Sequence, residues 1–110
     1  MSARRIDKLK ELYKRASTEF IQKHTEAEGF ILSITNAELS DKLNRLKIFF
    51  SVWPDQKEKD VLKSLESLKG GLRKELGERV KTKFVPQIEF VPDDSEKKRL
   101  RIEELLNKDK

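Results

Sequence analysis

Residues 68–95 read LKGGLRKELGERVKTKFVPQIEFVPDDS, with a glycine pair, a basic run and a strand-like segment in that order. Two adjacent glycines cost the interior of a helix roughly 1 kcal/mol each relative to alanine. We therefore expect the preceding helix to kink or break at Gly70-Gly71, and helical spacing to resume at Leu72. A helix that restarts there presents unpaired backbone N–H groups and the positive end of its dipole. With basic side chains around it, that end is a candidate phosphate site.

Basic residues gather in this stretch and in one other. Residues 69–83 hold six basic and two acidic side chains, and residues 4–23 hold seven and three, although the 110-residue chain has a net charge of only +5. Two basic segments on an otherwise slightly acidic chain predict a patch that binds a polyanion such as nucleic acid. The alternative interpretation is a pair of solvated helix faces. The candidate RNA-binding residues are Lys69, Gly70, Gly71, Arg73, Lys74, Arg79, Lys81, Lys83, Arg4 and Arg5.

Hydrophobic spacing predicts the other elements. Steps of three and four mark helices, and strict alternation marks strands. In chain order we expect a helix at 4–24, strands at 30–35 and 46–53, a helix up to the glycine pair, a further helix to about residue 80, and a strand around 85–90. The short link after the first strand makes the first two strands an antiparallel hairpin. Because Pro86 lacks a backbone donor, the last strand should have an irregular start or lie at an edge.

The chain offers few groups for catalysis. It has no cysteine and one histidine, His24, which we expect at a helix end rather than in a metal or catalytic site. Trp53 could stack on a base, but beside a proline at a strand end we expect it at the edge of the core. We therefore predict no catalytic residue, no metal, no cofactor and no enzyme activity. With no apolar run near the roughly 20 residues of a membrane helix and no leader-like N-terminus, we expect a cytoplasmic protein.

Several motifs occur together in a characteristic order. They are residues 29–35 (GFILSIT), 47–52 (KIFFSV), 72–79 (LRKELGER), Val85-Pro86 with Ile88 and Phe90, and 101–106 (RIEELL). Their order and spacing, from about residue 4 to residue 106, resemble the ribosome-binding factor A family. The family pattern places an Ala-x-Gly helix kink where this chain has Leu68-Lys69-Gly70. It also places an Asp-Pro-Arg run where this chain has residues 25–28 (TEAE).

The resemblance implies a fold and a role. The fold would be a single α+β domain of type II KH-like order, α-β-β-α-kinked α-β, with the helices on one face of a three-stranded sheet. Residues 1–95 would form this domain and residues 96–110 a charged C-terminal helix or tail. The role would be assembly of the small ribosomal subunit: binding the immature subunit and assisting maturation of its ribosomal RNA, notably at the 5′ end.

Other interpretations remain open from the sequence. The chain could be a general KH-type RNA chaperone or adaptor, or a protein-interaction module that uses the exposed side of the hairpin. In the assembly interpretation the partners are the small ribosomal subunit and its ribosomal RNA. We expect a monomer, with no membrane and no small-molecule substrate.

Overall fold

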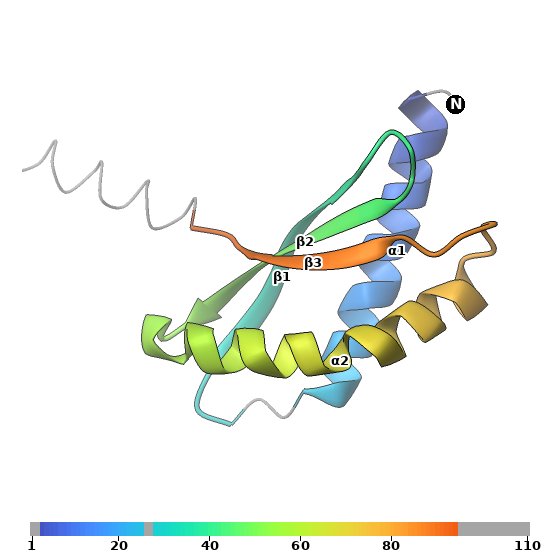
Figure 1. Cartoon of the computed structure of the whole chain (residues 1–110). Coiled ribbons are helices and arrows are strands. Elements are labelled where there is room, and N and C mark those ends of the chain that lie inside the picture. Colours follow the sequence, from blue (N-terminus) through green and yellow to red (C-terminus); the bar gives the residue numbers. More distant parts are fainter. Residues whose placement is uncertain (1–2, 26–27, 95–110) are drawn as a thin grey trace, which may run out of the picture.

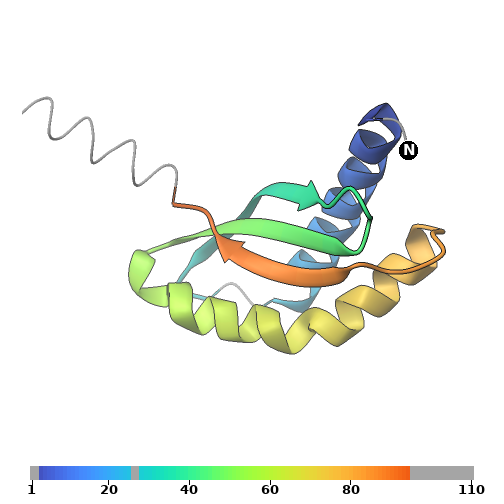
Figure 2. The ribbon, with the colours of Figure 1, turned by 45° about the horizontal axis from the view of Figure 1, so that its top comes forward.

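The protein is described by a computed structural model, which covers residues 3–25 and 28–94. Figures 1 and 2 show two helices packed against one face of a three-stranded sheet. The elements are α1 (Ala3–His24), β1 (Ile31–Leu39), β2 (Arg45–Trp53), a 3-10 turn (Asp55–Lys57), α2 (Glu58–Arg79) and β3 (Gln87–Pro92). The predicted α+β class is therefore confirmed. The predicted tail at 96–110, and the boundary before it, lie outside the described residues.

The central strand β2 supplies much of the core. It pairs antiparallel with β1 and parallel with β3, in the order β1-β2-β3. Its alternate side chains face the helices and are buried, as the sequence predicted: Leu46, Ile48, Phe50 and Val52. Ile88 and Phe90 of β3 are buried beside them. β3 is an edge strand and begins directly after Pro86, which confirms the predicted effect of that proline.

β1 ends four residues later than predicted. The sequence placed its end near Thr35, but the ladder continues to Leu39. The register shifts between Ile34 and Asn36, so Thr35 is an extra residue on this strand. Because side chains alternate strictly along a strand, one extra residue exchanges the inner and outer positions. Ala37 is consequently fully buried, at a position that simple alternation from the first half would place outside.

Of the kink or break predicted at Gly70-Gly71, the break is wrong, because α2 is continuous from Glu58 to Arg79. Backbone N–H groups inside a helix bond to the carbonyl four residues earlier, so the predicted free N–H groups do not exist here. Both halves of α2 bury side chains in one core: Val61, Leu65, Leu72 and Leu76. That packing offsets the unfavourable propensity of the glycines. Figure 2 shows that the ribbon of α2 nevertheless bends along its length.

The two glycines have different surroundings. A Cβ atom on Gly71 would lie 3.1 Å from Cζ of Phe20, so this glycine lets α2 pass close to α1. A Cβ atom on Gly70 would meet nothing within 4 Å. Gly71 is therefore explained by helix packing, whereas nothing in the packing around Gly70 requires a glycine.

The Gly70→Ala variant tests the continuity of α2. We expect its free energy of unfolding to rise by roughly 0.5–1 kcal/mol, because alanine has the higher helix propensity and a smaller loss of backbone entropy. Urea denaturation followed by circular dichroism measures the change. Gly71→Ala is the matched control and should gain less, since the Phe20 ring must move. A loss of stability in Gly70→Ala would contradict a continuous helix at this position.

Candidate nucleic-acid interface

Most of the candidate RNA-binding residues lie on the second half of α2 and on loop 80–86, which joins α2 to β3. The exposed members of this group are Gly70, Gly71, Lys74, Arg79, Lys81 and Lys83, and the half-buried ones are Lys69 and Arg73. The fold thus gathers eight candidates that the sequence had placed in one segment. It does so on one continuous helix and its following loop, rather than around a helix start.

Loop 80–86 is held in place by side chains from both helices. The Thr82 hydroxyl donates to the backbone carbonyl of Phe84 at 3.0 Å and lies 2.9 Å from the Tyr13 hydroxyl of α1. Since the Thr82 proton is used in the first bond, Tyr13 is the donor in the second. Val85 packs over Gly77, where a Cβ atom would lie 3.0 Å from the valine Cγ2. Contacts with both helices therefore hold the loop in a defined position.

Arg73 anchors the end of the same loop. Its Nε donates to the carbonyl of Pro86 and one terminal nitrogen donates to the carbonyl of Val85, both at 3.2 Å. A guanidinium offers its donors in a fixed planar fork, which suits two neighbouring carbonyls. Arg73, a candidate for RNA, is therefore already used to fasten α2 to the chain entering β3.

The Arg73→Ala variant should lose stability. We expect its free energy of unfolding to fall by roughly 1.5–3 kcal/mol, the range for a hydrogen bond to a charged donor, because two carbonyls lose their partner. Thermal and urea unfolding measure the loss, with Lys74→Ala as the control at an exposed neighbour. A fully stable Arg73→Ala that binds RNA weakly would instead make Arg73 a direct RNA contact.

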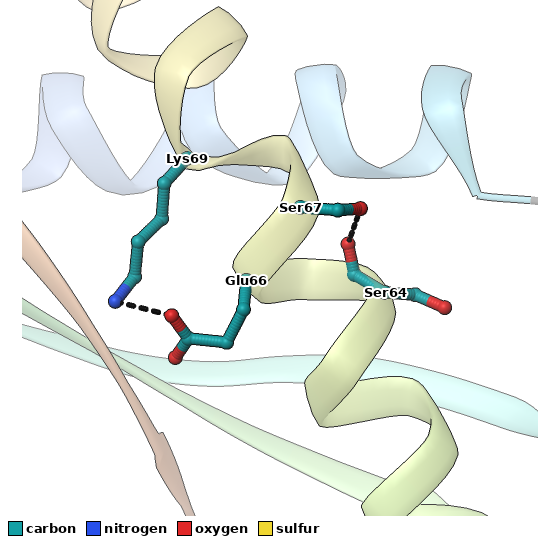
Figure 3. A network of polar contacts seen from close by, with 4 residues as sticks. All are labelled: Ser64, Glu66, Ser67 and Lys69. Carbon is teal, nitrogen blue, oxygen red and sulfur yellow. Dashed lines mark hydrogen bonds and ion pairs between the residues drawn. The ribbon is translucent and has the colours of Figure 1, made fainter.

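Two other candidates form surface ion pairs. Lys69 Nζ lies 2.6 Å from Glu66 Oε2, one turn earlier on α2 (Figure 3), and 5.8 Å from the centre of the Phe90 ring. The same view shows the Ser67 hydroxyl donating a hydrogen bond to the backbone carbonyl of Ser64, within the helix. Arg79 reaches across to Glu19 of α1, with nitrogen and oxygen 2.7 Å apart.

These pairs do not exclude phosphate binding. All four side chains retain between 33% and 49% of their exposure, and such surface pairs contribute about 0–1 kcal/mol. A phosphate could therefore replace either carboxylate at small cost. In the free protein, these ion pairs partly neutralise the positive charges of Lys69 and Arg79.

Three lysines differ from these. Within residues 3–25 and 28–94, Lys74 and Lys81 make no ion pair or hydrogen bond. Lys83 lies over the ring of Phe84, with Nζ 5.5 Å from the ring centre. All three are exposed. Unpaired ammonium groups at the surface attract a polyanion most directly, because no carboxylate has to be displaced.

Arg4 and Arg5 lie in the first turns of α1 and are exposed. Tyr13, the anchor of loop 80–86, comes nine positions after Arg4, which is about 14 Å along the helix. Figures 1 and 2 show the start of α1 and this loop at the same end of the molecule. A shallow hollow beside Arg4 has mixed charge and is lined by Arg4, Asp7, Lys8, Glu11, Leu12 and Arg15.

The remaining aromatic and titratable candidates have clear outcomes. His24 is exposed at the end of α1, its Nδ1 2.9 Å from the carbonyl of Phe20 and its ring stacked on the Phe20 ring, which confirms the helix-end prediction. Trp53 is 70% exposed, so the prediction of a core-edge position is wrong. Trp53 is exposed because it takes an outward-facing alternate position on β2, and the adjacent proline does not bring it inward.

In the part of the chain that is described, no group of His, Cys, Asp and Glu could hold a metal ion. Neither described helix is long and apolar enough to cross a membrane.

The element order and the single covered sheet face define an α+β domain of KH-like type. A family model described as ribosome-binding factor A matches residues 5–106, and the chain belongs to this family. Ribosome-binding factor A of Halothermothrix orenii is 41% identical over 98% of this chain and 90% of its own length. The crystal structure of ribosome-binding factor A from Thermus thermophilus superposes with a TM-score of 0.70 and 26% identity, over 79% of this chain and 94% of that one.

One further structural relative was seen with its partner. It is a homology model of Thermus thermophilus ribosome-binding factor A, fitted into a cryo-electron microscopy map of a 30S–ribosome-binding factor A complex. It has a TM-score of 0.68 and 26% identity to this chain, over 79% of this chain and 93% of that one.

Proposed function

We propose that this chain binds the immature small ribosomal subunit and assists maturation of its ribosomal RNA, notably processing at the 5′ end. Membership of the ribosome-binding factor A family and the 30S complex of a structural relative support binding to the small subunit. The proposed role in RNA processing rests on the family resemblance carried by the sequence motifs.

The surface proposed for the RNA consists of the exposed basic residues of α2 and loop 80–86. The observation that carries this assignment is a pair of lysines without a partner among the described residues, Lys74 on α2 and Lys81 on loop 80–86. Lys83 lies on the same loop, which the fold holds in place. Lysine ammonium groups bind phosphate as point charges and read no base sequence. The contacts should therefore follow the shape and backbone of the RNA. Arg4 and Arg5 would extend the surface along α1.

Deletion of the gene tests the processing role. We expect cells without the protein to accumulate small-subunit RNA with an extended 5′ end, measured by primer extension on total RNA. A plasmid copy of the wild-type chain should restore the mature end, and a copy with both Lys74→Glu and Lys81→Glu should not. Mature 5′ ends at the wild-type level in the deletion strain would contradict this part of the proposal.

A second candidate function has one observation in its favour. Ile31 and Trp53 are partners across the β1–β2 ladder and are 63% and 70% exposed, so the hairpin presents an apolar pair to solvent. Such a pair could contact a protein instead of RNA. Binding to subunits that disappears in Trp53→Ser but survives Lys74→Glu with Lys81→Glu would favour this protein-interaction role. A general RNA adaptor would instead bind unrelated RNAs as tightly as the subunit.

The proposal also includes the state and location of the protein. It would act as a monomer in the cytoplasm, where ribosomal subunits are assembled, and as a binding factor rather than an enzyme. Size-exclusion chromatography with light scattering tests the monomer, and a mass of two chains would contradict it.

A further inference from the structure

Phe84 is the most exposed large hydrophobic side chain among the described residues, at 74%. Sequence alternation would place it inside, since Pro86, Ile88 and Phe90 at the following even positions are buried. The chain between Val80 and Pro86 is a loop rather than a strand, so the alternation of β3 does not extend back to Phe84. The course of the backbone in this loop therefore directs the Phe84 ring into solvent.

The backbone on both sides of Phe84 is fixed. The carbonyl of Phe84 itself accepts the Thr82 hydroxyl, which is held in turn by Tyr13 of the buried core. On the other side, Arg73 holds the carbonyls of Val85 and Pro86. The ring is thus presented to solvent by a loop that loses little freedom when it binds a partner. Pre-ordering of this kind lowers the entropy cost of binding.

The loop that carries the ring is positively charged. From Val80 to Ile88 the chain has two lysines and no acidic residue. Lys83 Nζ lies over the Phe84 ring at 5.5 Å from its centre, and Lys81 is exposed without an ion pair in the described structure. An exposed aromatic face among cations is the arrangement with which proteins bind single-stranded nucleic acid: the ring stacks on a base and the cations hold the backbone.

We propose that Phe84 stacks on an unpaired base of the RNA, while Lys81 and Lys83 hold the flanking phosphates. The inference deepens the proposed function and rests on it, because it names the kind of RNA segment that this surface takes. Unpaired bases are the usual target, since bases stacked in an A-form helix are not accessible to a side chain. A base on the open face of the ring would leave Lys83 on the other face. Stacking of this kind tolerates any base, so the segment is selected by being single-stranded.

Four variants test the stacking. Phe84→Ala should weaken binding roughly 5- to 150-fold, the range for loss of one base–aromatic stack. Phe84→Tyr should bind like wild type because the ring is kept, and Phe84→Leu should resemble the alanine variant. Ile31→Ala, at a similarly exposed apolar residue on the hairpin, is the matched control and should bind the oligonucleotide like wild type. The probes are a fluorescently labelled, unstructured RNA oligonucleotide and purified small subunits, each titrated at several salt concentrations.

The salt dependence separates the ring from the lysines. A stacked base releases no counterions, so Phe84→Ala should leave the slope of log K against log salt unchanged. Lys83→Ala should reduce the slope by about 0.7 on the single strand, as expected for one lost phosphate contact. Equal melting temperatures of all variants would show that the fold is intact.

Two outcomes would overturn the inference. Wild-type affinity in Phe84→Ala would show that the ring makes no contact, and wild-type affinity in Phe84→Leu would show an apolar contact rather than a stack. In both cases, tight binding of wild type to subunits leaves the proposed function standing. Wild type that binds neither the oligonucleotide nor the subunit would instead remove the proposed function together with the inference.

Discussion

Reversal of Lys74 and Lys81 to glutamate is expected to weaken binding to the small ribosomal subunit by roughly tenfold for each lysine, about 100-fold together. Each reversal removes one phosphate contact and places a carboxylate against the RNA backbone. The slope of log K against log salt is negative, and its magnitude should fall by about 2, one for each lost contact. Titration of labelled protein with purified subunits, at several salt concentrations, measures both quantities.

The structure decides which residues to change. Arg73 fastens the loop to β3, so its replacement would confuse stability with binding. Lys69 already pairs with Glu66. Lys74 and Lys81 are exposed and unpaired in the described structure. Lysine and glutamate have similar helix propensities, which matters for Lys74 on α2, whereas Lys81 lies on the loop after the helix. Their reversal should therefore leave the fold intact.

A matched control lies on the first half of the same helix. Lys59 and Lys63 are also exposed, and reversing them changes the net charge by the same amount. We expect this pair of changes to weaken binding much less. An equal loss in the two double variants would mean that total charge, and not the surface at the end of α2, governs the affinity.

Replacement of Leu72 by alanine should lower the free energy of unfolding by about 2–5 kcal/mol, the usual cost of truncating a buried leucine. Leu72 is fully buried and directly follows the glycine pair. The loss would be a large part of the roughly 5–15 kcal/mol that stabilises a typical domain. Urea denaturation followed by circular dichroism would measure it.

This prediction tests whether the second half of α2 belongs to the same core as the first. Leu68→Ala, at a half-buried position one turn earlier, is the control and should cost less. If the segment after Gly71 moved independently, Leu72→Ala would cost well under about 1 kcal/mol, because little buried surface would be lost. That result would restore the break that the sequence predicted.

The sequence predicted the strands well where one rule decided the outcome. Every second residue of β2 is apolar because one face of the strand lies on the helices, and its buried positions followed directly. The glycine pair was misjudged because propensity is a local and weak quantity, whereas the continuity of α2 depends on leucines that reach a core built from distant strands. The bulge at Thr35 carries no distinctive residue pattern, so the length of β1 could not be inferred.

The candidate site, like the fold, could be predicted from the sequence only in part. The clustering of basic residues is a property of the sequence, and the structure places them on one helix and loop. Their individual roles depend on contacts between residues far apart in the chain. Arg73 with Pro86, Arg79 with Glu19 and Tyr13 with Thr82 are all contacts of this kind. Exposure of Phe84 was also hidden, because it follows from where loop 80–86 ends and β3 begins.

Gradient sedimentation of cell lysate, with the protein detected in every fraction, tests the central claim most directly. The account predicts that at low salt the protein migrates with free small subunits and not with complete ribosomes. At moderate salt part of it should move to the light fractions, because phosphate contacts weaken. Residence in the light fractions alone at both salt concentrations would contradict binding to the small subunit.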